Sequence, residues 1–146
     1  MVIEKDLMLL GLEANSKEEV IEALCTHVCR QRGITDRELF AESVYEREGI
    51  GNTYMANGFA IPHGKSEALS TPFMALAQLE KPVAWNENGD MAELVFMIGV
   101  PAANEDNIHL KMIAGLCRRL VDETLVQSLK KRHISAEEVS KLINQS

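Results

Sequence analysis

The chain has 146 residues, of which 46% are hydrophobic and 25% are charged, and its formal net charge at pH 7 is -7. This length suits one domain, residues 1–146, and the acidic balance argues against a nucleic-acid-binding protein, which needs a basic surface. The longest apolar run, LVFMIGV, is too short to span a bilayer, and early acidic residues exclude a secretory signal peptide. We therefore expect a cytoplasmic protein with no direct membrane insertion.

The first predicted elements are one strand and two helices. LMLLGL, residues 7–12, is a short apolar run typical of a strand. Ser16 with Glu19 and Thr35 with Glu38 form capping boxes, in which the hydroxyl accepts from a free amide of the first turn and the carboxylate reaches back. After the boxes, apolar residues recur at helical spacing: Val20, Ile21, Leu24, Cys25 and Val28, then Leu39, Phe40 and Val44.

The rest of the chain contains further strands and helices. Three apolar runs bounded by turn residues predict strands: GFAIPH (58–63), FMALAQL (73–79) and AELVFMIGV (92–100). Helical spacing returns from about 105 to 120, and further helices are expected over 122–131 and after the capping box of Ser135 with Glu138. Because helices and strands interleave, we predict an α/β fold in which helices flank both faces of one mixed sheet.

The three cysteines, Cys25, Cys29 and Cys117, are an odd number without a secretory context, so we expect no disulfide framework. Cys25 and Cys29 could bind zinc together with His27. However, on a helix His27 points to another side, and no second ligand cluster follows. We therefore predict that the cysteines pack in the core, and that the chain holds neither a metal ion nor a cofactor.

His63 lies between Pro62 and Gly64 at the end of the run 58–63, and ligands of open α/β sheets usually bind outside strand ends. Pro62 lacks an amide hydrogen, so we expect it to end the strand ladder before His63. Gly64 lacks a Cβ, so a phosphate could approach the backbone there. A neutral imidazole can attack phosphorus with one nitrogen while the other donates a hydrogen bond. No Walker-type loop is present, so another protein would bring the phosphoryl group.

Two residues could stabilise a phosphate on His63. Arg47, sixteen residues earlier, could supply hydrogen bonds of about 1.5–3 kcal/mol each. His109 lies at the start of a later helix and would face the sheet. There it could donate a hydrogen bond to the phosphate, and the positive end of the helix dipole would also attract the anion. Each also has a structural interpretation, His109 as a core histidine and Arg47 as a solvated helix residue. His27 and His133 are expected at the surface, without a role.

Three segments, ERE (46–48), NTYMANGFAIPHGK (52–65) and EDNIHLKMIAGL (105–116), resemble the enzyme IIA domain of the fructose–mannitol family of the bacterial phosphotransferase system. The resemblance covers nearly the whole chain. Its specific part is an acidic residue followed at fixed spacing by a run that contains the histidine: Glu48, then Met55, Ala56, Ala60, Ile61, Pro62, His63 and Gly64.

This resemblance implies a mannitol enzyme IIA-like fold and a phosphocarrier function. The histidine-containing protein HPr, loaded from phosphoenolpyruvate through enzyme I, would phosphorylate His63 on Nε2. The group would pass to an enzyme IIB, which phosphorylates sugar during uptake through a membrane enzyme IIC. By position, Arg47 would clamp the phosphate and His109 would stabilise it. Thr53 is retained from the family pattern, and its hydroxyl could lie near the phosphate, as could the backbone at Gly64.

Two alternative functions would use the same histidine. A regulator of the nitrogen-related phosphotransferase branch would share the fold and the histidine but act by binding target proteins. A hydrolase using His63 as a base would need a nucleophile, and the sequence has no Gly-x-Ser-x-Gly elbow.

The chain departs from many relatives, which have STGIGNG where it has NTYMANG. Tyr54 and Ala56 thus replace glycines, and Phe59 stands where an aliphatic residue is more usual. Tyr54, Met55 and Phe59 could form an apolar rim around His63 for a partner protein, or pack in the core. These departures bear on partner and sugar specificity rather than on phosphoryl transfer.

Overall fold

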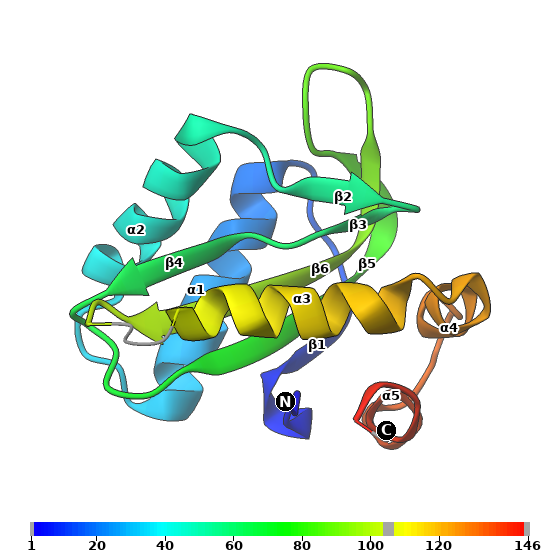
Figure 1. Cartoon of the computed structure of the whole chain (residues 1–146). Coiled ribbons are helices and arrows are strands. Elements are labelled where there is room, and N and C mark those ends of the chain that lie inside the picture. Colours follow the sequence, from blue (N-terminus) through cyan, green and yellow to red (C-terminus); the bar gives the residue numbers. More distant parts are fainter. Residues whose placement is uncertain (1, 104–106, 145–146) are drawn as a thin grey trace.

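The computed structural model describes residues 2–103 and 107–144, and it shows a central sheet with helices on both faces (Figure 1). The elements in chain order are η1 (Lys5–Leu7), β1 (Met8–Leu12), α1 (Lys17–Arg32), α2 (Arg37–Ile50), β2 (Tyr54–Ala56), β3 (Phe59–Ala60), β4 (His63–Ser66), β5 (Phe73–Ala84), β6 (Met91–Pro101), α3 (Ile108–Leu120), α4 (Glu123–Leu129) and α5 (Ala136–Ile143). The predicted α/β fold is confirmed.

The sheet has six strands in the order β1-β5-β6-β3-β2, with β4 also paired to β6. The long β5 and β6 form an antiparallel pair at its centre. β1 runs parallel to β5, β3 and β4 run parallel to β6, and β2 runs antiparallel to β3. The sheet is therefore mixed, as expected.

Two apolar cores lie on the two faces of the sheet. Side chains of α1 and α2 cover one face, where they meet alternate residues of the central strands such as Ala75, Ala77 and Met97. Side chains of α3, α4 and α5 cover the other face, with Leu76 and Phe96. Because successive strand residues point to opposite faces, a strand covered on both sides is apolar throughout, as predicted for 92–100.

The cysteines lie where the sequence places them. Cys25 and Cys29 are buried in the core under α1, while Cys117 is half-buried against the other core, and all three are free thiols. His27 is not directed at them, since its Nε2 lies 2.7 Å from the backbone oxygen of Asp6. The prediction of core packing is confirmed.

Two of the three predicted helix caps are confirmed. The hydroxyls of Ser16 and Ser135 each accept from the amide three residues later, at 3.1 Å. The prediction for Thr35 is wrong, because Asp36 caps α2 and its carboxylate accepts from the amide of Leu39 at 3.1 Å. A carboxylate there also places negative charge at the positive end of the helix, which a threonine hydroxyl does not.

The prediction that Pro62 ends the strand ladder is wrong. The carbonyl of Pro62 accepts from the amide of Ile98 at 3.1 Å, and pairing with β6 continues through β4. Proline lacks only the donor of the ladder and keeps its acceptor, so the strand resumes directly after it. β3 ends at Ala60 and β4 begins at His63, so His63 opens a second short strand on the same neighbour, β6.

The short strand β2 was not predicted. It forms a hairpin with β3 through Asn57 and Gly58, whose φ angles of 48° and 83° lie in the left-handed region. Asn-Gly is the residue pair that two-residue hairpin turns prefer, so this dipeptide was the available signal.

The C-terminal helices agree with the sequence. α3 spans Ile108–Leu120, and positions 105–106 of the predicted helix lie outside the described residues. α4, Glu123–Leu129, falls inside the predicted 122–131. Within residues 2–103 and 107–144, no helix has both the length and the apolar character needed to cross a bilayer.

Candidate active site

The imidazole of His63 has a defined orientation. His63 pairs with Ile98 of β6, whose side chain belongs to the core under α3, so His63 faces α3 as well. Its Nδ1 lies 3.0 Å from the carbonyl oxygen of Ile61. Because a carbonyl can only accept, Nδ1 carries the hydrogen, and the neutral ring has its lone pair on Nε2. Nε2 is therefore the ring nitrogen that could act as a nucleophile.

His63 lines a cavity of about 460 Å³ between α2, β4 and α3. Its walls come from three segments that are far apart in the sequence: Ser43, Glu46, Arg47 and Ile50 of α2; His63, Gly64 and Lys65 of β4; His109, Leu110 and Ile113 of α3. The cavity thus joins the three residues expected to handle phosphate, His63, Arg47 and His109.

His109 lies beside His63. The centroids of the two rings are 5.9 Å apart, and their planes are inclined by 35°. His109 is the second residue of α3 and only 8% exposed, and it shares the inward face of that helix with the buried Leu116 and Leu120. The expected inward orientation at the start of a helix is confirmed.

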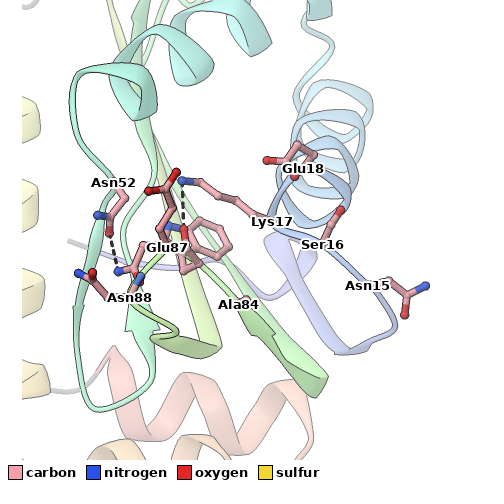
Figure 2. A pocket seen from close by; sticks show the side chains of 10 residues that line it. Asn15, Ser16, Lys17, Glu18, Asn52, Ala84, Glu87 and Asn88 are labelled. Atoms are coloured by element: carbon pink, nitrogen blue, oxygen red, sulfur yellow. Dashed lines mark hydrogen bonds between the residues drawn. The ribbon is translucent and has the colours of Figure 1, made fainter.

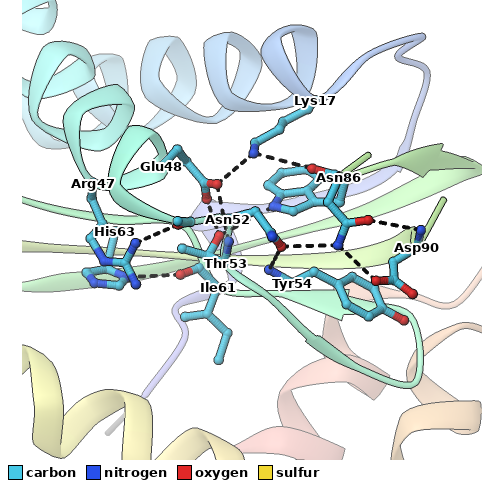
Figure 3. A network of polar contacts seen from close by, with 12 residues as sticks. Lys17, Arg47, Glu48, Asn52, Thr53, Tyr54, Ile61, His63, Asn86 and Asp90 are labelled. Carbon is cyan, nitrogen blue, oxygen red and sulfur yellow. Dashed lines mark hydrogen bonds and ion pairs between the residues drawn. The ribbon is translucent and has the colours of Figure 1, made fainter. Parts of the chain in front are cut away.

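Arg47 lies in the last turn of α2, on the wall of the same cavity (Figure 3). Its Nη1 donates to the carbonyl oxygen of Gly51 at 2.7 Å. A guanidinium has five N–H donors, so this bond holds the side chain and leaves donors for an anion.

The environment lowers the pKa of both histidines below the usual 6.5. For His63 burial is the main cause, and the positive charges of Arg47 and Lys65 add to it, while the hydrogen bond with Ile61 and the charge of Glu48 act in the opposite direction. For His109 the causes are burial, then Lys65, then His63. Both rings are therefore neutral near pH 7, as nucleophilic attack by His63 requires.

Lys65 was missed by the sequence analysis. It lies two residues after His63 on a strand, so both side chains point to the same face, and it lines the cavity. It adds a basic group to the cavity besides Arg47 and the two histidines. Because side chains on a strand alternate between its two faces, the position of Lys65 two residues after His63 could have indicated this.

The predicted apolar rim is different in the structure. Phe59 is buried in the core against Phe96, and Tyr54 accepts from the amide of Gly58 through its hydroxyl at 2.9 Å. Met55 is exposed on β2 but does not line the cavity. Two residues that were not predicted line the cavity with exposed apolar side chains instead: Ile50, 85% exposed, and Leu110, 55% exposed.

Gly64 and Thr53 have surroundings other than those expected. A Cβ on Gly64 would come within 2.2 Å of the Ser43 Oγ, so the missing side chain lets β4 pack closely on α2, while Gly64 also lines the cavity. Thr53 is buried outside the cavity, where its hydroxyl donates to Glu48 and accepts from Trp85 Nε1 at 3.4 Å. The structure does not bring this hydroxyl to the other site residues.

Another hollow, of about 630 Å³, lies near the start of α1 and the turn between β5 and β6 (Figure 2). Its walls are mostly polar and include no histidine, and the amine of Lys17 there is already bound to Glu48 at 2.7 Å. In the described segments, no three His, Cys, Asp or Glu side chains gather as metal ligands. The cavity at His63 is therefore the better candidate for chemistry.

The chain is similar to proteins of one known family. The family model of the phosphoenolpyruvate-dependent sugar phosphotransferase system, EIIA 2, matches residues 1–146. This chain belongs to that family. Members of the EIIA family are phosphoryl-transfer components of that system.

Solved EIIA structures have the same fold. The nitrogen regulatory protein IIA-Ntr from Neisseria meningitidis superposes with a TM-score of 0.87 at 25% identity, over 97% of this chain and 96% of that one. Enzyme IIAMTL from Escherichia coli, in a complex with phosphorylated enzyme IIBMTL, superposes with a TM-score of 0.83 at 25% identity, over the same shares of each chain. The EIIA fold therefore occurs in both sugar-specific and regulatory proteins.

Curated EIIA relatives include both kinds as well. The fructose-like EIIA component of Escherichia coli (strain K12) is 28% identical over 138 residues, which cover 94% of this chain and 91% of that protein. The nitrogen regulatory protein of Bradyrhizobium diazoefficiens is 31% identical over 131 residues, or 88% and 84% of the two chains. The 2-O-alpha-mannosyl-D-glycerate-specific EIIABC component of Escherichia coli (strain K12) is 31% identical over 123 residues, and the match covers 83% of this chain but 19% of that protein.

Proposed function

We propose that this chain is a phosphoryl carrier of the sugar phosphotransferase system. His63 Nε2 accepts the phosphoryl group from phospho-HPr in the cytoplasm and passes it to an enzyme IIB, which serves a membrane enzyme IIC. The observation that carries this proposal is the hydrogen bond between His63 Nδ1 and Ile61, since it leaves the lone pair on Nε2 in a cavity shared with Arg47 and His109.

The transfer is a displacement at phosphorus. The lone pair of His63 Nε2 forms the new N–P bond while the N–P bond to the donor histidine breaks and its electron pair returns to the donor ring. The Nδ1 hydrogen stays bonded to the carbonyl of Ile61. Such transfers need little beyond positioning and charge neutralisation, which Arg47, His109 and Lys65 supply from the walls of the cavity.

Ile50 and Leu110 fit the contact with a partner protein. Both are exposed apolar residues on opposite walls of the cavity, one at the end of α2 and the other in the first turn of α3. A partner that covers them removes apolar surface from water and excludes water from the transferred group. These two residues take the role that the sequence analysis gave to Tyr54, Met55 and Phe59.

A regulatory function is the second candidate. The likeness to nitrogen regulatory proteins, in sequence and in structure, supports it. In that case His63 is still phosphorylated, but its phosphorylation state controls binding to a target protein. Onward transfer to a sugar-specific enzyme IIB supports the first function, and binding to a target without such transfer supports the second.

The central experiment incubates the protein with phosphoenolpyruvate, enzyme I and HPr. We expect an acid-labile, alkali-stable phosphate on the wild type and none on His63→Ala. The matched control is His133→Asn, because His133 is exposed outside the cavity and asparagine tolerates its positive φ of 62°. Phosphate that persists on His63→Ala would remove His63 from the proposed role.

A further inference from the structure

A buried ion pair lies behind the candidate site (Figure 3). Glu48, in the last turn of α2, binds Lys17, the first residue of α1, with Nζ and Oε2 2.7 Å apart. The side chains are 5% and 18% exposed, respectively. Lys17 also donates to the carbonyl oxygen of Trp85 at 3.3 Å and lies 5.4 Å from the centre of its ring. Both charges are therefore held in fixed positions by the fold.

The carboxylate of Glu48 in turn fixes Thr53. It accepts from the backbone amide of Thr53 at 3.2 Å and also from the threonine hydroxyl. The oxygen of that hydroxyl in turn accepts from Trp85 Nε1, at 3.4 Å. Two bonds from one carboxylate to one residue define both the position and the orientation of the segment that follows α2.

Thr53 is linked by backbone bonds to the ring of His63. The carbonyl oxygen of Thr53 accepts from the amide of Ile61 at 3.0 Å, and the carbonyl oxygen of Ile61 is the partner of His63 Nδ1. The segment after α2 also contains Gly51, whose carbonyl oxygen binds the guanidinium of Arg47. The segment after α2 therefore carries the carbonyl that accepts from Arg47, and it positions the carbonyl of Ile61 that accepts from His63.

We propose that Glu48, held by Lys17, is a positioning residue that fixes the tautomer and ring orientation of His63 and the placement of Arg47. This inference rests on the proposed phosphoryl-carrier function. Glu48 does not line the cavity, so it acts through Thr53 and Ile61 and not by touching the transferred group. A loose carbonyl at Ile61 would let the imidazole turn or take the other tautomer, and the lone pair would then leave Nε2.

The test compares Glu48→Gln and Lys17→Met with a control that removes an exposed ion pair, Lys5→Met with Glu137→Gln. The first measurement is ¹⁵N NMR of the imidazole nitrogens in the unphosphorylated protein. We expect the Nδ1–H tautomer of His63 in the wild type and the control, and a mixture of tautomers in Glu48→Gln and Lys17→Met. This measurement needs no phosphoryl donor.

The second measurement is the rate of phosphorylation by HPr. We expect Glu48→Gln to be slower by about 10- to 100-fold, because small misplacements of reacting groups have effects of this size. Lys17→Met should act in the same direction. The double variant should be no slower than Glu48→Gln alone, since both residues act through one link.

A third variant keeps the test decisive if Glu48→Gln does not fold. Thr53→Val removes the hydroxyl but keeps the backbone amide and the side-chain size, and we expect it to shift the tautomer equilibrium in the same direction. A folded Glu48→Gln or Thr53→Val with the tautomer and rate of the wild type overturns the inference. If the wild type itself takes no phosphate, the proposed function fails, while the NMR result still decides the role of Glu48.

Discussion

The imidazole rings of His63 and His109 face each other with their centroids 5.9 Å apart, one on the first residue of β4 and the other in the first turn of α3. Both rings line the cavity that a phosphoryl group on His63 Nε2 would occupy. The relationship depends on the packing of α3 on the sheet and on no local sequence feature.

We expect His109→Ala to retain some phosphorylation of His63 but to slow onward transfer. The loss should be about 10- to 100-fold, because a hydrogen bond to a charged group contributes about 1.5–3 kcal/mol. Single-turnover transfer from the phosphorylated protein to its enzyme IIB measures the effect. Transfer at the wild-type rate would make His109 a structural residue of the core.

Arg47→Lys keeps the positive charge but loses the planar set of donors. We expect slower phosphorylation than in the wild type, because an ammonium cannot hold the Gly51 carbonyl and a phosphate in the same fixed geometry. Rapid-quench measurement of phosphate uptake from HPr provides the rate. Arg30→Lys, an exposed change on α1, is the matched control, and equal rates in both variants would contradict a role of Arg47 at the site.

The pKa values of His63 and His109 should lie below 6.5, and Lys65→Met should raise both. Removing a nearby positive charge makes protonation easier, so each pKa moves toward its usual value. NMR titration of the imidazole carbon-bound protons measures both residues in one experiment. Unchanged values in Lys65→Met would show that the lysine does not act on the site.

The same shifts set the direction of pH effects. A histidine whose pKa is lower in the folded state stabilises the fold fully above its unfolded value of about 6.5 and loses this contribution as the pH falls below it. We therefore expect the free energy of unfolding to decrease as the pH falls below 6.5, partly because of His63 and His109. In the double variant His63→Ala with His109→Ala this decrease should be smaller. Phosphate uptake should fall in the same range, because a protonated Nε2 has no lone pair. Denaturant unfolding at several pH values and the rate of uptake measure the two effects.

Gly64→Ala should destabilise the protein by about 1–3 kcal/mol, the usual range for overpacking. The new Cβ would meet Ser43 Oγ at 2.2 Å and the Ser43 Cβ and Val44 nitrogen at 3.1 Å. Adding Ser43→Ala removes the nearest atom and should recover part of the loss. Denaturant unfolding measures both variants, and an unchanged midpoint in Gly64→Ala would show that β4 and α2 separate easily.

Hydrophobic periodicity, a local signal, predicted the fold class. Local context made His63, Arg47 and His109 candidates and the resemblance to enzyme IIA grouped them, but their proximity depends on how α2, β4 and α3 pack. It misplaced the strand boundary at Pro62, since the acceptor of a proline remains available to a neighbouring strand. The link between Lys17 and Glu48 could not be predicted, because it depends on how α1 and α2 pack. The surroundings of Gly64 and Thr53 were not predicted for a similar reason, because both residues lie against side chains that only the tertiary fold brings near them. The phosphate contacts expected of them stay predictions.

The hydrogen bond that occupies His63 Nδ1 leaves one ring nitrogen for both transfers, which has a consequence for the two partner proteins. If Nε2 of His63 both accepts and gives up the phosphoryl group, the donor protein and the acceptor protein must bind at the same cavity, so their binding is mutually exclusive. An excess of unphosphorylated acceptor would then compete with the donor and slow rephosphorylation of His63. The overall rate of transfer would therefore depend on the concentration ratio of the two proteins as well as on the rate of each transfer step.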